Sequence, residues 1–334
     1  MTGVPPAGAA PPPRWPAPAE LLVHHVDRAT LVPLVHETAP GAPLPFRIGA
    51  FGPDDLPVAA AIHRRGGHAA NPPPFAAAEE DWDGDFIYGG QLWDHFGHFL
   101  LESLSRAWAF ATLPGPVLWQ RAVSHSRLLP WQRDILDLLG LGAREHRVID
   151  RPVRVARLAV PEQGLVTRRY LHAWQEAALA AHPCRTPQPG HCVWLSRSDL
   201  PARLARVDGE AEVEAALAAD RWTILHPETM SLADQLAALE AAEVIAGFEG
   251  SAFHSLLLVR DVRARIVIFG RGPRINPNYQ VIAHAKGLDQ RLVSLDLEHL
   301  GGKGRVASYR LSRPAQVLDV LREMTMATEA APRQ

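Results

Sequence analysis

The sequence predicts an α/β protein whose second half contains a parallel β-sheet with helices on both faces. Between residues 191 and 297, short apolar strands alternate with helices of about ten residues, a rhythm typical of successive β-α-β units. The chain has 334 residues, which is long for one domain, so we expect two. Hydrophobic residues make up 47% of the chain and charged residues 21%, as in ordinary globular proteins.

The elements of the first half are expected from local patterns. The proline-rich residues 1–19 predict a disordered tail, and residues 20–90 predict short strands and loops. Over residues 94–112, Phe96, Leu100 and Leu104 share one face of a predicted helix. A second helix is expected over 129–141, followed by strands over 147–160.

The second half is expected to fold as alternating strands and helices. Ser231 with Asp234 resembles a capping box at the start of one helix, and Gly287 ends another. The expected strands are 191–197, 222–225, 244–248, 265–269 and 292–297, and the expected helices are 208–219, 231–242, 251–259, 278–286 and 314–326. We therefore predict a first domain over 20–185, a second over 186–313, and a C-terminal helix and tail over 314–334.

Charge and cysteine content exclude several classes of protein. With 34 basic and 36 acidic residues the formal charge is −2, so no general affinity for nucleic acid or anionic membranes is expected. Two cysteines, Cys184 and Cys192, do not make a disulfide framework. The uncharged stretch 107–120 is too short for a transmembrane helix, and the N-terminus shows no secretory signal. We expect a soluble, cytoplasmic protein.

The most informative segment is GGQLWDHFGHFLLESLSRAW, residues 89–108. On a continuous helix, His95, His98, Glu102 and Arg106 form one stripe away from the apolar face. Such a stripe can supply a general base and an anion contact, with Glu102 holding His98 in one tautomer. The alternative is a solvated polar face.

A second segment, VIAGFEGSAFHSLLL at residues 244–258, runs from a strand into a helix through a glycine turn. In parallel sheets, ligands collect at the carboxyl ends of strands, where helix N-termini offer N–H groups to phosphate. Gly250 permits close backbone approach and Ser251 can donate, while Glu249 suits a sugar contact or a base. The alternative is an ordinary turn.

Arginines follow two of the predicted strands, where guanidinium groups suit an anion. They are Arg197, Arg203 and Arg206 after the 191–197 strand, and Arg271 and Arg274 after the 265–269 strand.

Three patterns have the residue types of a metal site, and none is preferred as one. Asp81 and Asp83 match a D-x-D pattern, but they follow acidic residues rather than a hydrophobic strand, and Phe86 stands where a calcium loop needs glycine. His95 and His98 lack a third ligand. The third pattern is a group of histidines and cysteines whose spacings differ from those of zinc sites: His182, Cys184, His191 and Cys192.

Taken in order, these segments resemble glycosyltransferase family 61, the bacterial capsular polysaccharide biosynthesis-like transferases. The resemblance spans about residues 85–297. The matching motifs are Trp93 to His98 with Leu104 to Arg106, Leu195 to Arg197, Arg203 to Glu210, Pro227, Glu228, Ser231 and Gln235, Gly247 to His254, and Asn278 with Tyr279. The chain departs from this pattern at Glu249, where many relatives have histidine, and at Asp208-Gly209-Glu210, where an Asn-Glu pair is usual.

This resemblance implies a GT-B-like enzyme with two Rossmann-type domains facing a cleft. The expected reaction is the inverting, metal-independent transfer of a sugar from a nucleotide-sugar donor to a hydroxyl of a glycan acceptor. The expected donor is a uridine diphosphate sugar. No cofactor is expected, and a membrane-bound acceptor would be reached by peripheral association. Two other functions stay open: a non-catalytic nucleotide- or glycan-binding relative, suggested by Glu249, and a metal-dependent transferase using Asp81 and Asp83.

The residues of this reaction are assigned as follows. His95, supported by Glu102 and with His98 beside it, is the first choice for the base, and Glu249 is the second. The acceptor is assigned to Asp94 and Arg106. The donor is assigned to Arg197, Arg206, Gly250, Ser251, His254 and Arg271.

Overall fold

The computed structural model describes residues 17–121, 127–183, 186–200, 206–272, 274–302 and 307–329. The described chain divides into two compact units, one ending at His182 and the other beginning at Pro183. Each is a mixture of helices and strands, which confirms the predicted α/β class. Predicted Arg203 and Cys184 lie outside the described residues.

The C-terminal unit is built on a five-stranded parallel sheet in the order β15-β13-β16-β17-β18. Its strands are β13 (Cys192–Leu195), β15 (Thr223–Leu225), β16 (Val244–Phe248), β17 (Arg265–Phe269) and β18 (Gln290–Val293). From β13 the chain first adds β15 on one side and then β16 on the other. This reversal makes the gap between β13 and β16 the switch point at which doubly wound sheets bind ligands.

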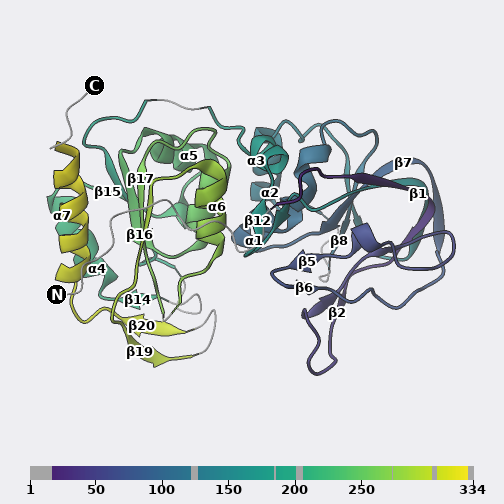
Figure 1. Ribbon diagram of the computed structural model, residues 1–334, viewed down its shortest axis with the longest axis horizontal. Helices are drawn as coiled ribbons and strands as arrows, with labels where there is room; N and C mark the ends of the chain where they lie inside the picture. Colours follow the sequence, from purple (N-terminus) through teal and green to yellow (C-terminus); the bar gives the residue numbers. More distant parts are fainter. Residues whose placement is uncertain are drawn as a thin grey trace. The chain divides into compact units, whose positions relative to one another are not determined.

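Helices cover both faces of this sheet, as Figure 1 shows. They are α4 (Glu210–Ala219), α5 (Leu232–Ala241), α6 (Asn278–Lys286) and α7 (Ala315–Glu329), with the 3-10 helices η4 (Pro227–Thr229) and η5 (Ser251–Leu257). On one face, Trp194 and Phe248 pack with α4 and α7 through Leu217 and Leu321. On the other face, α5, η5 and α6 cover Val193, Ile245 and Ile266. This alternation follows from the two-residue period of side chains along a strand.

Local signals explain several of the boundaries. Ser231 caps α5 by accepting the N–H of Asp234, and Gly287 ends α6 in the left-handed conformation, both as predicted. β16, β17 and α6 span the predicted residues. By contrast, the segment predicted as a helix over 251–259 is the 3-10 helix η5, whose Ser251 start follows an extended Gly250 without a side-chain cap. A small sheet of β14 (Val207–Asp208), β20 (Ser308–Arg310) and β19 (Glu298–Gly301) completes the unit.

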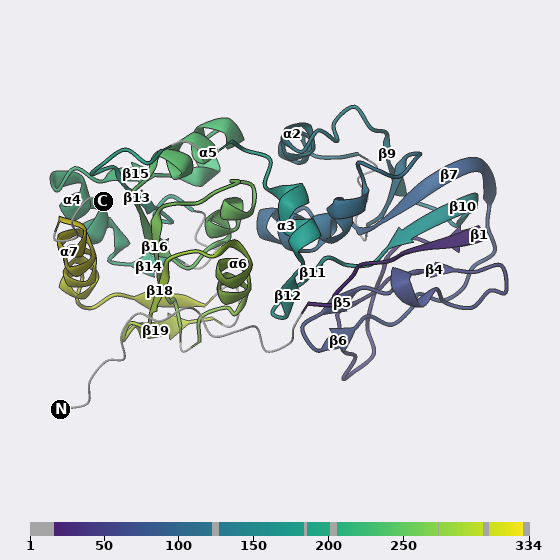
Figure 2. The same ribbon diagram turned by 45° about the horizontal axis from the view of Figure 1, so that its top comes forward.

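The N-terminal unit contains a six-stranded sheet in the order β4-β1-β10-β7-β8-β9. These strands are β1 (Val23–Leu31), β4 (Ala50–Phe51), β7 (Glu80–Gln91), β8 (Val117–Gln120), β9 (His146–Ile149) and β10 (Val153–Pro161). The run from β10 to β9 is parallel, while β1 pairs antiparallel with both β10 and β4, so the sheet is mixed. β7 and its neighbours appear in Figure 2.

Short elements surround this sheet. The helices are η1 (Ala59–Ala61), α1 (Phe96–Leu101), η2 (Ser103–Ala109), α2 (Pro130–Leu138) and α3 (Ala173–Leu179). Three two-stranded pairs join β2 (Val35–His36) to β3 (Phe46–Arg47), β5 (Arg64–Arg65) to β6 (His68–Ala69), and β11 (Leu165–Val166) to β12 (Tyr170–Leu171). The core contains Leu31, Tyr88, Leu118, Val155 and Val160.

The continuous helix predicted over 94–112 is wrong. Helix α1 ends at Leu101. Its C-cap residue, Glu102, has a φ of −123° and a ψ of −49°, outside the helical region, and the 3-10 helix η2 follows. Since a 3-10 helix has about three residues per turn, the stripe predicted on an α-helix is not maintained past this point. Glu102 and Arg106 are consequently buried, with 2% and 1% of their surface exposed.

Candidate active site

Two groups of polar side chains carry the chemistry expected from the sequence, one in each unit. The first follows the strands β13, β16 and β17 at the carboxyl edge of the parallel sheet. Because Leu195 pairs with Gly247 in neighbouring strands, the residues after them, Arg197 and Gly250, come to the same edge.

Arg197 lies directly against Gly250. A Cβ placed on Gly250 would be 2.5 Å from Nη1 of Arg197, so only glycine lets the guanidinium lie this close to the backbone. Burial, together with nearby Arg271, lowers the pKa of Arg197 to about 10, and the group therefore stays a cation at neutral pH. A half-buried cation on a bare backbone edge is suited to an anionic ligand.

Arg271 and Glu249, predicted separately, form one pair. The Nε–H of Arg271 donates to the backbone oxygen of Glu249 at 2.6 Å, and its backbone N–H donates to Oε2 of Glu249 at 3.2 Å. The Glu249 backbone N–H donates in turn to Phe269 at the end of β17. Glu249 is therefore tied to the loop after β17.

Aromatic residues hold the turn that contains Gly250. The hydroxyl of Tyr279 donates to the backbone oxygen of Gly250 at 3.1 Å, and the buried ring of His254 stacks on Tyr279 with centroids 5.5 Å apart. Burial raises the pKa of Tyr279, so its hydroxyl remains a donor. Ser251 is half-buried at the start of η5. Tyr279 belongs to a motif noted in the sequence, but its contact with Gly250 depends on the fold.

Arg206 lies apart from this pattern. It is exposed, and its Nε–H donates to the backbone oxygen of Leu200 at 2.5 Å. Arg274 is exposed as well.

The second group surrounds Glu102 in the N-terminal unit. Its Oε1 accepts a 2.6 Å hydrogen bond from Nδ1 of His98. Its Oε2 accepts from His63 Nε2 at 3.2 Å, from Arg65 Nη2 at 2.6 Å and from Gln91 Nε2 at 2.8 Å. These donors hold the pKa of Glu102 well below its usual range against the opposing effect of burial, so the carboxylate is ionised.

Ionisation of Glu102 fixes the protons of both histidines. An ionised carboxylate can only accept, so Nδ1 of His98 and Nε2 of His63 must carry hydrogen. Burial lowers the pKa of His63 and keeps it neutral, and its Nδ1 accepts from the Gln163 side chain at 3.3 Å. A neutral His98 then has its lone pair on Nε2. The interaction of Glu102 with His98 is the one predicted from their spacing.

His98 also has one accessible side. Its side chain is 30% exposed, and its ring lies beside the rings of Trp93 and His95, at 5.3 and 5.2 Å between centroids. His95 itself is exposed and occupies the N-cap position of α1 in extended conformation. Arg65 covers the Trp93 ring from 5.6 Å. The result is an aromatic surface next to a histidine whose tautomer is fixed.

Asp94 and Arg106, predicted to bind the acceptor, have protein partners. Asp94 forms an ion pair with Arg121. Arg106 donates to the backbone oxygens of Pro161 at 2.8 Å and Ala60 at 3.1 Å, and lies over the ring of Tyr88. The expected place of Arg106 on a stripe away from the apolar face is wrong, because the helix breaks before it and Arg106 is buried.

The partners of Glu102 could not be found from helical spacing. His63 lies just before β5, Arg65 is in β5 and Gln91 is the last residue of β7. Arg65 is 37 residues distant from Glu102 in the sequence. A histidine and an arginine two residues apart are common in sequences, so nothing local distinguishes them. Their convergence depends on the pairing of distant strands.

The metal patterns lie elsewhere. Asp81 and Asp83 are exposed in β7 and line a hollow of about 460 Å³ together with Arg147. Within the described residues, no group of three or more His, Cys, Asp or Glu side chains is arranged to hold a metal ion.

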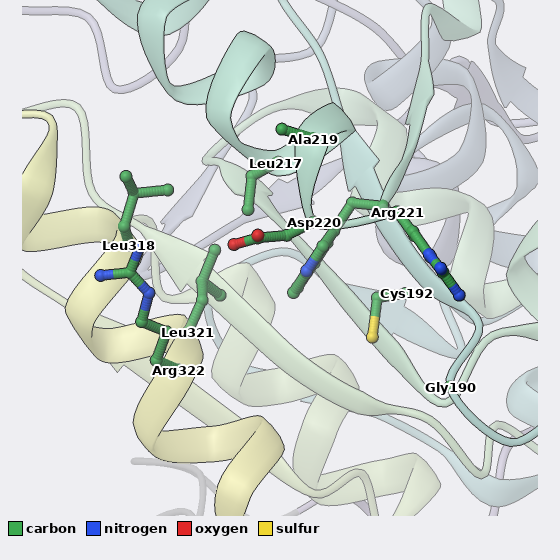
Figure 3. A pocket seen from close by; sticks show the side chains of 10 residues that line it. Gly190, Cys192, Leu217, Ala219, Asp220, Arg221, Leu318, Leu321 and Arg322 are labelled. Atoms are coloured by element: carbon green, nitrogen blue, oxygen red, sulfur yellow. The ribbon is translucent and has the colours of Figure 1, made fainter.

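A further hollow of about 470 Å³ lies at the opposite end of the sheet, beside the first residue of β13. Figure 3 shows Cys192, Leu217, Asp220, Arg221 and Leu321 around it. Burial raises the pKa of the Cys192 thiol to about 11, so the thiol is protonated and a poor nucleophile. This hollow is separate from Arg197, which follows the carboxyl end of the same strand.

Comparison with known protein families gives a match that covers half of the chain. The family model described as Glycosyltransferase 61 matches residues 96–266, a stretch that includes His98, Glu102, Arg197 and Gly250. A search of the curated proteins found no match to the chain. Among the described residues, none of the helices is both long enough and apolar enough to cross a membrane.

Proposed function

Because the chain belongs to glycosyltransferase family 61 and is a glycosyltransferase, we propose that it transfers a sugar from a nucleotide-sugar donor to a hydroxyl of a glycan acceptor. The observation that carries this proposal is the position of Arg197 on Gly250, at the switch point of a doubly wound sheet. Nucleotides bind at such points because strand ends and nearby backbone N–H groups face the phosphates.

The donor diphosphate would be held at this edge. Departure of a nucleoside diphosphate builds negative charge on its bridging oxygen, and a nearby cation stabilises that charge. Arg197 supplies such a cation, and Arg271, anchored on Glu249, supplies another. Neutralisation by arginine is consistent with metal-independent transfer, which we include in the proposal. A uridine diphosphate sugar is the proposed donor.

The acceptor hydroxyl needs a base, and we assign that role to His98. Nε2 of His98 would take the hydroxyl proton as the acceptor oxygen forms its bond to the anomeric carbon and the bond to the diphosphate breaks. Glu102 would stabilise the resulting imidazolium. One direct displacement inverts the anomeric centre, so the proposal is an inverting mechanism.

His95 and Glu249 remain the other candidates for the base. The contact of Glu102 with His98 favours His98 over His95, since the carboxylate both fixes the tautomer and stabilises the charge that develops. The Glu249 carboxylate already accepts the backbone N–H of Arg271, so one of its oxygens is occupied by the loop after β17.

The remaining parts of the proposal follow from the predicted reaction. The C-terminal unit would bind the donor and the N-terminal unit the acceptor, as in a GT-B-like enzyme. We propose a cytoplasmic location, where nucleotide sugars are available, and peripheral association with any membrane-bound acceptor. The aromatic surface of Trp93, His95 and His98 suits the faces of an acceptor sugar.

The test is a turnover assay on the full chain. The protein is incubated with a panel of nucleotide sugars and glycan acceptors, and released nucleoside diphosphate is measured with and without chelator. We expect acceptor-dependent release that the chelator leaves unchanged. Loss of release in chelator would overturn the metal-independent mechanism in favour of Asp81 and Asp83, and absence of release with every donor would overturn the nucleotide-sugar proposal.

A further inference from the structure

Two carboxyl groups of helix α4 hold the turn that presents Arg197. We infer that Glu210 and Glu214 are positioning residues, which set the Ser196–Ser198 turn and thereby keep the Arg197 guanidinium against Gly250. This inference rests on the proposed function, because it assigns the two residues to binding of the donor diphosphate.

Glu210 acts on the backbone of the turn. It is the first residue of α4 and is only 1% exposed. Its Oε1 accepts the backbone N–H of Arg197 at 3.0 Å and the indole N–H of Trp194 at 3.3 Å. The carboxyl therefore connects Trp194 inside β13 to Arg197, two residues beyond the end of that strand.

Glu214 acts on the side chains of the same turn. One helical turn after Glu210, on the same face of α4, it accepts the hydroxyl of Ser196 at 2.6 Å and that of Ser198 at 3.0 Å. The backbone N–H of Ser198 donates to the Ser196 hydroxyl at 3.1 Å. Residues on both sides of Arg197 are thus fixed to one helix.

This bonding leaves Arg197 little freedom of direction. The side chain begins from a backbone held at three consecutive residues and ends at Gly250, where even a methyl group would collide with it. Ordering the arginine before the ligand arrives reduces the entropy lost on binding. Without these acceptors the chain would still turn after β13, but the orientation of the Arg197 side chain would not be fixed.

The charge state of Glu210 is compatible with an anion site. Burial and the nearby Glu214 raise its pKa to about 8, so Glu210 is neutral at pH 7. The charged and titratable groups around Arg197 also include Arg271 after β17, Glu228 in η4 and Tyr279 on α6. Ionisation of Glu210 at alkaline pH would add a negative charge beside the diphosphate.

Packing alone does not explain an acid at this position. Within the described residues, Oε2 of Glu210 has no hydrogen-bond partner, and a buried oxygen of this kind costs stability. An apolar residue would avoid that cost, but it would remove the acceptor of the Arg197 backbone N–H and of the Trp194 indole N–H. The acid is therefore explained by the conformation of the turn.

The inference is tested by titrating Glu214→Ala with uridine and guanosine diphosphate in a calorimeter. We expect affinity about three- to tenfold below that of the parent, because the cation remains but is less well placed. Glu212→Ala is the matched control, since Glu212 is an exposed carboxylate of the same helix, and it should bind like the parent. In an Arg197→Ala background, Glu214→Ala should cause no additional loss, as residues acting through one contact are not additive.

Two more variants make the outcome decisive. Ser198→Ala removes a single hydroxyl and serves if Glu214→Ala is poorly folded; we expect about a two- to fivefold loss. Glu210→Gln keeps the accepting oxygen, so its affinity should stay constant from pH 7 to 9 while that of the parent falls near pH 8. Equal binding by parent, Glu214→Ala and Ser198→Ala would overturn the inference alone. Failure of the parent to bind either nucleotide would overturn the proposed donor site first.

Discussion

Oε1 of Glu102 lies 2.6 Å from Nδ1 of His98, and the same carboxylate accepts from His63 and Arg65 through its other oxygen. This arrangement differs from a surface ion pair, because Glu102 is 2% exposed and its charge is balanced entirely by side chains. Among the described partners of Glu102, His98 is the one whose ring is accessible to solvent. The cluster therefore links a buried anion to a partly exposed imidazole, whose second nitrogen, Nε2, does not contact the carboxylate.

The first prediction concerns His98. If Nε2 is the base, His98→Ala should lower turnover by about 100- to 10,000-fold, the usual contribution of a positioned base. Affinity for nucleoside diphosphate should be unchanged, because the base contacts the acceptor. His98→Gln should behave alike, since an amide cannot take the proton. Steady-state kinetics with calorimetry checks both quantities.

His95→Ala is the comparison for this prediction. It retains the Glu102–His98 hydrogen bond, so we expect a smaller loss that falls mainly on the KM for the acceptor. If His95→Ala instead abolishes turnover while His98→Ala retains it, the base is His95, as the sequence first suggested.

The second prediction concerns stability and pH. The folded-state pKa of Glu102 lies below its usual value of 4.5, so the unfolded chain binds more protons in the window between those two values. The stabilisation is thus complete above about pH 4.5 and is lost as the pH falls through the folded-state pKa. Glu102→Gln should cost about 3 kcal/mol or more at pH 7, because it leaves buried cationic and polar groups without their acceptor.

Urea unfolding at pH 7 and pH 4 measures this difference, which should shrink at the lower pH. Glu145→Gln, which removes a surface carboxylate paired with Arg147, is the control and should change stability by less than about 1 kcal/mol. A Glu102→Gln variant as stable as the parent at pH 7 would show that the buried cluster does not depend on the charge.

These predictions also show what could be read from the sequence. β16, β17 and α6 were bounded correctly because strand and helix periodicity and a terminal glycine are local signals. The membership in glycosyltransferase family 61 was likewise indicated by ordered motifs and is confirmed. The spacing of His98 and Glu102 was sufficient to predict their hydrogen bond, because four residues span one helical turn.

What the sequence did not indicate depends on distant contacts. The break at Glu102 satisfies a carboxylate that binds His63 and Arg65, so tertiary bonding decided the local conformation. Arg106 follows this break and is buried, where its guanidinium donates to the backbone oxygen of Pro161. The proximity of Arg197 to Gly250 required the order of β13 and β16, which periodicity does not contain.

The third prediction concerns Arg197. Its replacement by alanine should weaken binding of nucleoside diphosphate by about 1.5–3 kcal/mol, the range of a charge-assisted contact, or roughly 10- to 150-fold in Kd. The melting temperature should change little, since burial of this cation is itself costly. Arg313→Ala, at an exposed arginine of the same unit, makes the same change of charge and should bind normally. Equal nucleotide affinity in Arg197→Ala and parent would remove Arg197 from the site.

The last prediction uses Gly250, where the backbone and the guanidinium are closest. Its φ of −167° and ψ of 166° are extended, so alanine can adopt them without strain. The new methyl would lie 2.5 Å from Nη1 of Arg197, the mobile end of a flexible side chain, which can move away. Gly250→Ala should therefore fold with nearly the parent's stability while binding uridine diphosphate about tenfold more weakly, as expected for loss of one charge-assisted contact. Gly247→Ala provides the contrast, since its methyl would lie 2.7 Å from the backbone oxygen of Leu195 and should destabilise the sheet itself. Full affinity in a folded Gly250→Ala protein would mean that the diphosphate does not depend on this position of Arg197.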